Sequence, residues 1–474
     1  MSHVTSHQSQ SQQQSKRALM ATWQGSEAHR PGSHQQASQV GGTRAPSEPR
    51  SVRAYCAETP HCIALSVRLR RCQSGAARLL RSRIADIPRR LGVRAWTLLV
   101  LTSALALLPP VRAGESGTPP AASTLSSAQP APPASAGSSD PLGVWLTTVD
   151  SDVLRDQEAA RRASEELSRN GFSRAALPLY SGGHVTWPLD PSQNPFGLAL
   201  DPDLPTPDHA LKVLRELGKD GLVRVGWMEF GLMAPDDAPW LRDRQDLLLR
   251  DRAGGTLWAE SPRLNRVWLN PARPEVQAFL EALVVDACTR LPLEMIQFDD
   301  HLGYPSRFGY DATTLALWRA TRDGAVDPTP DPDAPAWLRL RADQVTALLQ
   351  RLRGAMRRSC PQVKLSLAPN PREFSYRSSL ADWPSWIRLG LVDELVVQIY
   401  RWDPRALEHE LADAGLRLAR QQLPVRIGLL AGLRGQPKDD ASLQRELEAV
   451  RAQGYGGIDL FFYETVRSHL PLKP

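Results

Sequence analysis

Two adjacent carboxylates, Asp299 and Asp300, follow the apolar run Leu293–Phe298 directly. An ionised aspartate beside an apolar strand is costly to bury unless it is hydrogen-bonded or paired with a cation. A carboxylate pair at a strand end is therefore suited to proton transfer, and together with His301 it could also hold a hard cation.

Hydrolysis of a glycosidic bond uses two carboxyl groups, one as the acid and the other as the nucleophile or base. Asp299 or Asp300 is the predicted acid, and the sequence leaves open which of the two carries the proton. Glu464 and Glu229 are the predicted partners. The structural alternative is that one aspartate caps the following turn, the other pairs with Arg307, and Glu464 is a surface carboxylate.

Polar and aromatic side chains near the same apolar runs form the predicted substrate-binding set. They are Asp150, His184, Trp187, Trp258, Trp268, Gln297, His301, Tyr304, Arg307, Asn370, Gln398, Tyr400 and Trp402. The aromatic rings are expected to stack on sugar faces, and the polar groups to bind hydroxyls. Asp150 has an alternative role as a helix N-cap, because an apolar helical pattern follows it.

Eight short apolar runs position these residues, and amphipathic stretches separate the runs. The predicted strands are residues 143–149, 174–180, 222–228, 293–298, 363–368, 394–400, 425–430 and 458–463. The predicted helices are residues 156–169, 207–219, 274–290, 336–358, 404–421 and 441–453. This alternation predicts a closed (β/α)8 TIM barrel over residues 141–474. A doubly wound open sheet is the alternative, but no glycine-rich phosphate-binding turn follows the first strand.

The candidate residues fall at the C-terminal ends of the predicted strands, where barrel enzymes carry their active sites. Side chains alternate between the two faces of a strand, so Gln297 and Asp299 are expected to face the barrel interior. The same alternation directs Asp300 toward the loop rim. It also places Trp227 with Glu229, and Gln398 with Tyr400, inside the barrel mouth.

Several barrel chemistries lack the residues they need. A Schiff-base aldolase requires a lysine at a strand end. The lysines of this region lie in predicted helices, at a strand start or in outer loops: Lys212, Lys219, Lys364, Lys438 and Lys473. The first strand also lacks the paired histidines of a metal-dependent amidohydrolase. We therefore expect no cofactor and no obligatory metal.

Positive charge is concentrated at the N-terminus. Residues 1–113 hold 16 Lys and Arg against 4 Asp and Glu, and the chain totals of 57 and 51 leave 41 basic and 47 acidic residues for the remainder. The predicted barrel is therefore mildly acidic, which argues against nucleic-acid binding. Residues 1–87 read as a disordered basic leader, either genuine or the product of a misassigned translation start.

Residues 88–113 resemble a secretory signal, with arginines before an apolar run at 96–108 and a small-residue cleavage pattern at Ala113. Residues 114–140 form a Pro/Ala/Ser-rich linker. The protein is thus expected to be exported to the periplasm or the extracellular space. It would meet a membrane only if the 96–108 segment is retained as an anchor. The oligomeric state is left open.

Cys288 and Cys360 each end a predicted helix just before neighbouring strands. A disulfide between them is geometrically conceivable in an oxidising compartment. Two buried, inert thiols are the favoured reading, because neither cysteine has a histidine nearby in the sequence.

Four segments resemble the glycoside hydrolase-like family 10 proteins, which are bacterial, often exported TIM barrels. The segments are Gly143–Ser151, Gln297–Pro305, Gln398–Trp402 and Gly457–Glu464. Many relatives have an arginine where this chain has Leu142, so a substrate contact made by that arginine is in doubt. The resemblance implies a hydrolase of glycosidic bonds in a bacterial polysaccharide, with peptidoglycan glycan strands as a substrate for some members of the family. The alternative is a non-catalytic carbohydrate-binding barrel at the cell envelope.

Overall fold

The computed structural model describes residues 141–474 except 149–150, 262–263, 322–328, 434 and 473–474. The predicted leader, signal-like segment and linker, residues 1–140, lie outside the described residues, as does Asp150. In the described part of the chain, no helix has the length and apolar character needed to cross a membrane.

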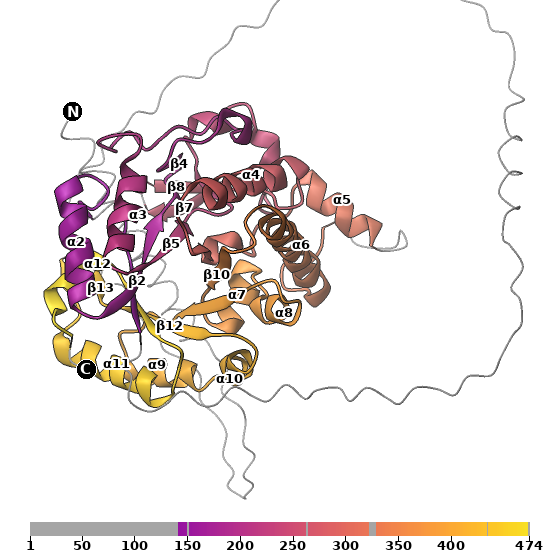
Figure 1. The fold of residues 1–474 in the computed structure, drawn as a ribbon. Helices are drawn as coiled ribbons and strands as arrows, with labels where there is room; N and C mark the ends of the chain where they lie inside the picture. The colour runs from indigo at the N-terminus through magenta and orange to yellow at the C-terminus, as the bar shows by residue number, and fades with distance from the viewer. Residues whose placement is uncertain (1–140, 149–150, 262–263, 322–328, 434, 473–474) are drawn as a thin grey trace, which may run out of the picture. The chain divides into compact units, whose positions relative to one another are not determined.

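Eight parallel strands close into a barrel, which confirms the predicted TIM-barrel fold (Figure 1). Around the barrel they are β1 (Leu142–Trp145), β2 (Phe172–Pro178), β5 (Val223–Met228), β9 (Met295–Asp299), β10 (Lys364–Ala368), β11 (Glu394–Gln398), β12 (Val425–Leu430) and β15 (Ile458–Phe461). Closure occurs between β15 and β1, where Trp145 pairs with Phe461. All eight predicted strands are therefore present.

Helices surround the barrel (Figure 1). They are α2 (Gln157–Arg169), α3 (His209–Lys219), α4 (Pro274–Arg290), α5 (Ala312–Ala320), α6 (Pro335–Ser359), α7 (Arg372–Ser379), α8 (Trp383–Arg388), α9 (Pro404–Leu411), α10 (Ala414–Arg420), α11 (Asp440–Ala452) and α12 (Tyr463–Val466). The predicted helix at 404–421 is divided, because Asp413 accepts hydrogen bonds from the amides of Gly415 and Leu416 and so caps a new helix.

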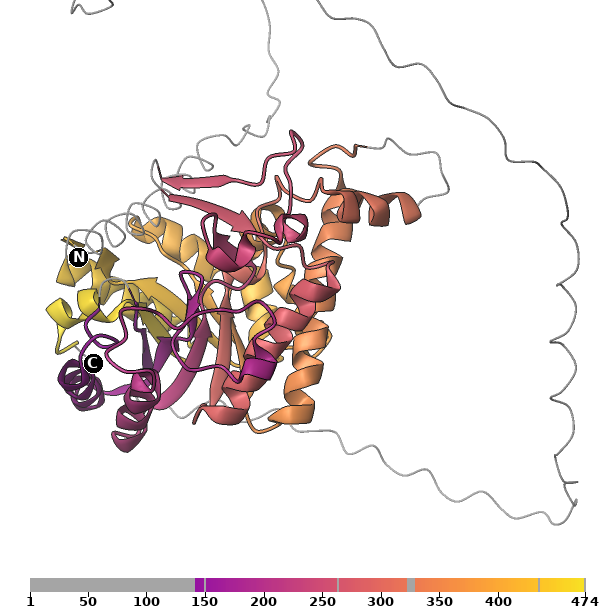
Figure 2. The ribbon, with the colours of Figure 1, turned by 90° about the horizontal axis from the view of Figure 1, so that it is seen from above.

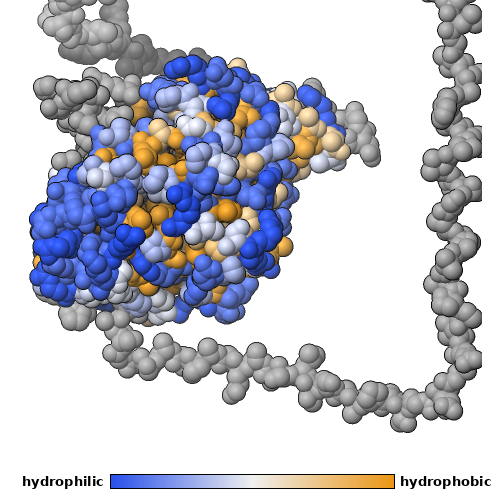
Figure 3. Space-filling model, turned by 45° about the horizontal axis from the view of Figure 1, so that its top comes forward, coloured by the Kyte–Doolittle hydropathy of each residue, from blue (hydrophilic) through white to orange (hydrophobic). Residues whose placement is uncertain are grey.

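Within the described residues, three small antiparallel sheets lie in the loops. They consist of β3 (Tyr180–Ser181) with β4 (His184–Val185), of β6 (Met233–Pro235), β8 (Leu264–Trp268) and β7 (Trp258–Ser261), and of β13 (Gly432–Leu433) with β14 (Gln436–Pro437). The sheet of β6, β7 and β8 lies in the connection between β5 and α4, and Figure 2 shows it across one end of the barrel. On the face seen in Figure 3, polar side chains separate small hydrophobic areas.

An ionic cluster fills the barrel interior near the N-terminal ends of the strands. Arg174 binds Glu394 at 2.7 Å and also pairs with Asp459, which Arg426 contacts as well. Burial opposes ionisation of Asp459, but the two arginines outweigh that effect and lower its pKa. The adjacent position on β1 is Gly143, where a Cβ would collide with the Asp459 carboxylate.

Cys288 and Cys360 form a disulfide, with their Cα atoms 6.0 Å apart. The favoured reading of two free thiols is therefore wrong. The bond joins the last turn of α4 to the end of α6, two helices that also pack against each other.

Candidate active site

Asp299 is the last residue of β9, and Asp300 begins a single 3-10 turn, η4 (Asp300–Leu302). The strand stops here because the Asp299 carboxylate accepts a hydrogen bond from the His301 amide at 2.9 Å, which caps the turn. The capping role that the structural alternative assigned to one aspartate is thus real. It does not remove the carboxylate from the barrel mouth.

Asp299 is only 7% exposed and keeps two partners in addition to the cap. The indole N–H of Trp227, on β5, donates to its Oδ2 at 3.1 Å, and Nδ1 of His301 lies 3.1 Å from its Oδ1. Burial raises the pKa of Asp299 to about 6, with a further contribution from the charge of Asp300, although His301 opposes the rise. The carboxyl group therefore holds a proton at a pH where an ordinary aspartate has lost it.

Asp300 is half-buried and accepts two amide hydrogen bonds. Asn370, two residues after β10, donates to Oδ2 at 3.1 Å, and Gln398, at the end of β11, donates to Oδ1 at 3.3 Å. The prediction that Asp300 turns toward the loop rim is wrong, since strand alternation ends at Asp299 and the 3-10 turn redirects the next side chain. Three strand ends thus meet at this carboxylate.

Glu229 follows β5 and is 7% exposed. Its carboxylate accepts a hydrogen bond from Ser181 Oγ at 2.6 Å, and its backbone carbonyl accepts one from His301 Nδ1 at 2.7 Å. Burial opposes a charge on His301, but the carboxylates of Asp299 and Asp300 outweigh burial and raise its pKa to about 10. His301 therefore links the ends of β5 and β9. It was predicted only as a polar residue lining the site.

Glu464 does not join this hydrogen-bonded group among the described residues. The eighth strand ends at Phe461, and Glu464 lies in α12, where it pairs with Arg467 at 3.4 Å. Arg467 in turn binds Glu166 of α2, on the outside of the barrel. In place of the expected meeting with the aspartate pair, Glu464 contacts the residue that directly follows its own helix.

The aromatic candidates divide by exposure. Trp402 is 40% exposed, and Trp258 is half-buried with Arg307 over its ring at 5.5 Å. Trp187, Trp268 and Tyr304 are 1%, 6% and 1% exposed. These three rings are buried, so they do not offer the open face that stacking on a sugar requires. The Trp187 indole, for example, donates to Asp286 of α4 at 2.6 Å and belongs to the core.

The remaining polar candidates, Gln297, Arg307 and His184, lie in different parts of the structure. Gln297 is inside the barrel, as strand alternation predicts, and it accepts from Trp145 at 2.7 Å and donates to Ser366 at 3.0 Å. Arg307 binds Asp251 at 3.0 Å and does not pair with Asp299 or Asp300. His184 lies on the β3–β4 hairpin with Nδ1 3.1 Å from the carbonyl of Gly182.

Tyr400, two residues after β11, is half-buried and packs its ring 5.6 Å from that of Phe461. Burial raises the pKa of its phenol well above the usual value, and the charges of Asp300 and Asp299 add to the rise. The group is therefore a hydroxyl donor at any ordinary pH. No hydrogen bond to that hydroxyl occurs among the described residues.

Three groups are close enough to share a cation. An oxygen of Asp299, an oxygen of Asp300 and a ring nitrogen of His301 all lie within 4.8 Å of one another. Oxygen and imidazole ligands suit several divalent ions. Both aspartates also accept hydrogen bonds from protein groups, as described above. The same arrangement is therefore compatible with a pair of carboxyl groups that acts without a metal.

Sequence reasoning missed Ser181 and Ser366, whose hydroxyls contact Glu229 and Gln297. Ser366 lies on the inward face of β10, so strand alternation could have identified it. Ser181 lies on a two-residue strand in a loop, for which the sequence carries no comparable signal.

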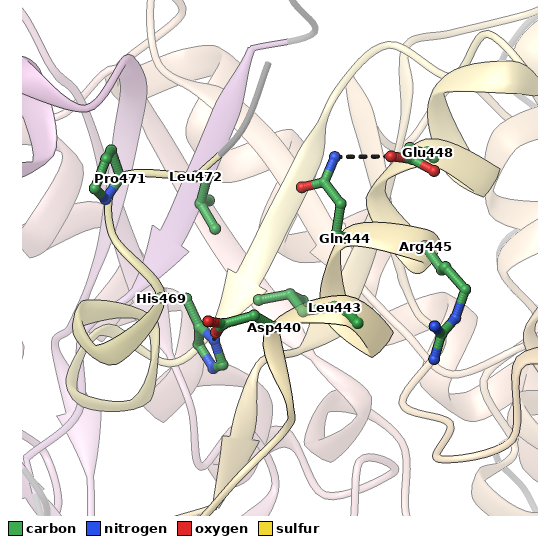
Figure 4. Close-up of a pocket in the computed structure, with 9 residues that line it drawn as sticks. Asp440, Leu443, Gln444, Arg445, Glu448, His469, Pro471 and Leu472 are labelled. Atoms are coloured by element: carbon green, nitrogen blue, oxygen red, sulfur yellow. Dashed lines mark hydrogen bonds and ion pairs between the residues drawn. The ribbon is translucent and has the colours of Figure 1, made fainter.

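A separate cavity of about 430 Å³ lies on the flank of the barrel (Figure 4). Asp440, Gln444 and Glu448 line it from α11, and His469 and Pro471 line it from the segment that follows α12. Gln444 donates to Glu448 at 3.0 Å. The cavity contains none of the strand-end carboxylates, so it is distinct from the candidate active site.

Comparisons with known proteins agree with this architecture. The family model described as glycosyl hydrolase-like 10 matches residues 142–445. Glycosyl hydrolase DigH of Escherichia coli K12 is 24% identical over 356 residues, which cover 66% of this chain and 76% of the relative. DigH of Shigella flexneri matches to the same extent.

Two solved structures share the fold. The glycoside hydrolase domain of PgaB (BpsB) from Bordetella bronchiseptica superposes with a TM-score of 0.54 at 13% identity, covering 70% of this chain and 96% of that one. Alpha-L-fucosidase isoenzyme 2 from Paenibacillus thiaminolyticus gives 0.50 at 14% identity, covering 69% and 48%. At these identities the likeness concerns the fold alone.

Proposed function

The chain belongs to the glycosyl hydrolase-like 10 family, and from this premise we propose that it hydrolyses glycosidic bonds in a bacterial polysaccharide, with peptidoglycan glycan strands as the substrate. The observation that carries the proposal is the carboxyl pair Asp299 and Asp300 at the C-terminal end of the fourth barrel strand, held by residues from three further strand ends or the turns after them. Substrates bind at this end of a TIM barrel.

Asp299 acts as the general acid in this proposal. An effective acid has a pKa near the working pH, and burial gives Asp299 a pKa of about 6. Asp300 remains an acceptor, because Asn370 and Gln398 donate to both of its oxygens. Asp299 thus gives the proton, and Asp300 stabilises the positive charge that develops on the substrate.

Polysaccharide is held outside the carboxyl pair by aromatic faces. Trp402 offers the most exposed ring of the predicted set, and Trp258 offers a second one stiffened by Arg307. Rings of this kind supply apolar contact area with little loss of side-chain entropy. Glu229 remains in the proposal as a further acidic group at the barrel mouth.

Export is part of the proposal. The disulfide between Cys288 and Cys360 supports an oxidising compartment such as the periplasm or the extracellular space. The signal-like pattern of residues 88–113 supports the same compartment.

Purified protein should be incubated with isolated glycan strands, and new reducing ends should be counted. Release by the wild type and its loss in Asp299→Asn or Asp300→Asn support the enzyme. The matched control is Asp343→Asn, which removes a carboxylate from an exposed ion pair on α6 and should leave release unchanged. Binding of the strands without release would instead support a non-catalytic carbohydrate-binding barrel.

A further inference from the structure

The spacing of the carboxyl pair is unusual for two groups that must act on opposite sides of a sugar. Retaining glycosidases generally place acid and nucleophile about 5 to 5.5 Å apart and inverting enzymes about 6.5 to 9.5 Å apart, with the reacting carbon between them. Oxygens of Asp299 and Asp300 approach within 4.8 Å. Their Cα atoms are neighbours, about 3.8 Å apart. Because the two residues lie at one strand end and an oxygen of each is within 4.8 Å of the other, both carboxyl groups meet the substrate from the same side.

In the described part of the chain, the two other candidate carboxylates have partners of their own. Glu464 is engaged in α12 with Arg467. Glu229 is buried and hydrogen-bonded to Ser181 at 2.6 Å. Some glycosidases need no nucleophilic residue, because the 2-acetamido group of the substrate attacks the anomeric carbon itself. An active site of that type must hold the acetamide by its N–H and its carbonyl.

The surroundings of Asp300 provide both contacts. Each Asp300 oxygen accepts one amide N–H, from Asn370 or Gln398, and each oxygen retains a lone pair for another donor. Tyr400 follows Gln398 by two residues, and its hydroxyl has no hydrogen-bond partner among the described residues. The charge of Asp300 acts on the Tyr400 phenol, so the two groups are near each other. A carboxylate acceptor and a hydroxyl donor together are complementary to an amide group, which has one N–H and one carbonyl oxygen.

We infer that the substrate's own 2-acetamido group is the nucleophile, held by Asp300 at its N–H and by Tyr400 at its carbonyl, so that cleavage requires an N-acetylated sugar. This inference rests on the proposed function and goes beyond it by naming the nucleophile and the residues that hold it. It also accounts for two adjacent aspartates, since the acid and the acetamide-binding group act on the same side of the ring.

The reaction has two balanced steps. The acetamide oxygen bonds to the anomeric carbon while that carbon's bond to the leaving group breaks, and the proton of Asp299 passes to the leaving oxygen. The product is a cyclic oxazolinium ion, whose N–H stays hydrogen-bonded to Asp300. Water then attacks the anomeric carbon and gives a proton to Asp299, and the bond to the acetamide oxygen breaks. The acetamide is restored, and the anomeric configuration is retained.

The test uses the purified full-length protein and one preparation of glycan strands carried through three treatments. The strands are de-N-acetylated, then divided and re-acylated with acetic anhydride or with trifluoroacetic anhydride. Cleavage should be lost on de-N-acetylation, return on N-acetylation and be slower after N-trifluoroacetylation, because fluorine withdraws electrons from the carbonyl oxygen. Equal cleavage of all preparations would overturn the inference and leave the proposed function standing.

Substitutions test the roles of Tyr400, Asp299 and Asp300 one at a time. Tyr400→Phe should lower kcat about 10²-fold with little change in KM, by analogy with the loss of one donor to a developing charge. Tyr455→Phe, which removes a hydroxyl bonded to the Leu411 carbonyl on the barrel flank, is the matched control. Asp299→Asn should regain activity on glycosides with good leaving groups, whereas Asp300→Asn should not. The reverse pattern would overturn these assignments.

Two further results discriminate the outcomes. Inhibition by a thiazoline analogue of the oxazolinium ion supports the inference. Covalent trapping of Glu229 by a 2-deoxy-2-fluoro glycoside would refute it, because a protein carboxylate would then be the nucleophile. Failure to cleave any N-acetylated strand would refute the proposed function, and the inference would fall with it.

Discussion

Replacement of Asp299 by asparagine should change how the unfolding free energy depends on pH. The buried carboxyl has a pKa of about 6 in the folded protein against an ordinary 3.8, a difference of about 2 units. Each unit corresponds to about 1.4 kcal/mol, so ionisation of Asp299 costs the folded state about 3 kcal/mol.

The sign follows from the direction of the shift. A raised pKa means that the folded state holds this proton more tightly than the unfolded chain does. The stabilising contribution is therefore complete below about pH 4 and is lost as the pH rises through 6. About 2 kcal/mol of this loss falls between pH 4 and pH 6.5. The range ends at pH 6.5 because histidines of the unfolded chain, with a pKa near 6.5, lose their protons above it and add their own pH dependence.

The asparagine side chain in Asp299→Asn would keep an oxygen for the His301 amide but would turn its NH2 group toward the Trp227 indole. That mismatch costs about 1 to 3 kcal/mol at every pH. The stability of Asp299→Asn relative to wild type should thus begin negative at pH 4 and rise by about 2 kcal/mol by pH 6.5.

Urea unfolding followed by tryptophan fluorescence at several pH values measures this difference. Asp343→Asn, in an exposed ion pair with Arg339, controls for the loss of one negative charge. If the difference between Asp299→Asn and wild type were constant from pH 4 to 6.5, the burial argument for Asp299 as a poised acid would be refuted.

Replacing Cys288 and Cys360 together with alanine should lower the unfolding free energy by about 4 kcal/mol, because the bond spans 72 residues; an unchanged urea midpoint would contradict this. Arg174→Met should cost about 3 to 5 kcal/mol, since two buried carboxylates lose their shared cation, and a thermal shift below about 2 °C would argue against the cluster. Trp402→Ala should raise KM for glycan strands roughly 10-fold at constant kcat, as expected for about 1 to 2 kcal/mol of lost apolar contact. EDTA should leave the rate unchanged, whereas loss restored by one divalent ion would identify a metal at the aspartate pair.

The barrel was predictable because its strands are apolar on both faces and are punctuated by polar residues at one end. The fourth strand shows why: Met295–Phe298 is buried throughout, and the pattern breaks at the first carboxylate. The short helix α7 was not predicted, since it lies in a loop and has too few turns to display a clear periodicity.

The sequence predicted those site residues that lie at the ends of neighbouring strands, because such ends converge in a barrel. Asn370, Gln398 and the aspartates meet because their strands or the turns that follow them are neighbours in the sheet. The orientation of Asp300 was not predictable from alternation, because a 3-10 turn starts there.

Hydrogen-bond and ion-pair partners that are far apart in the sequence could not be predicted from it. Trp187 was expected to stack on a sugar, but it is buried and its indole donates to Asp286, 99 residues away. The ionic cluster was missed for the same reason: Arg174 and Asp459 are 285 residues apart and meet only when the barrel closes. Charges on interior strand positions carry no local signal that identifies their partners.

The central claim is that the aspartate pair at the end of β9 cleaves a glycosidic bond. The most direct measurement is release of reducing ends from isolated glycan strands by the wild type, Asp299→Asn, Asp300→Asn and Asp343→Asn. The account predicts release by the wild type and Asp343→Asn, with loss of at least about 10²-fold in each site variant. Undiminished release by both site variants, or strand binding by the wild type without release, would contradict it.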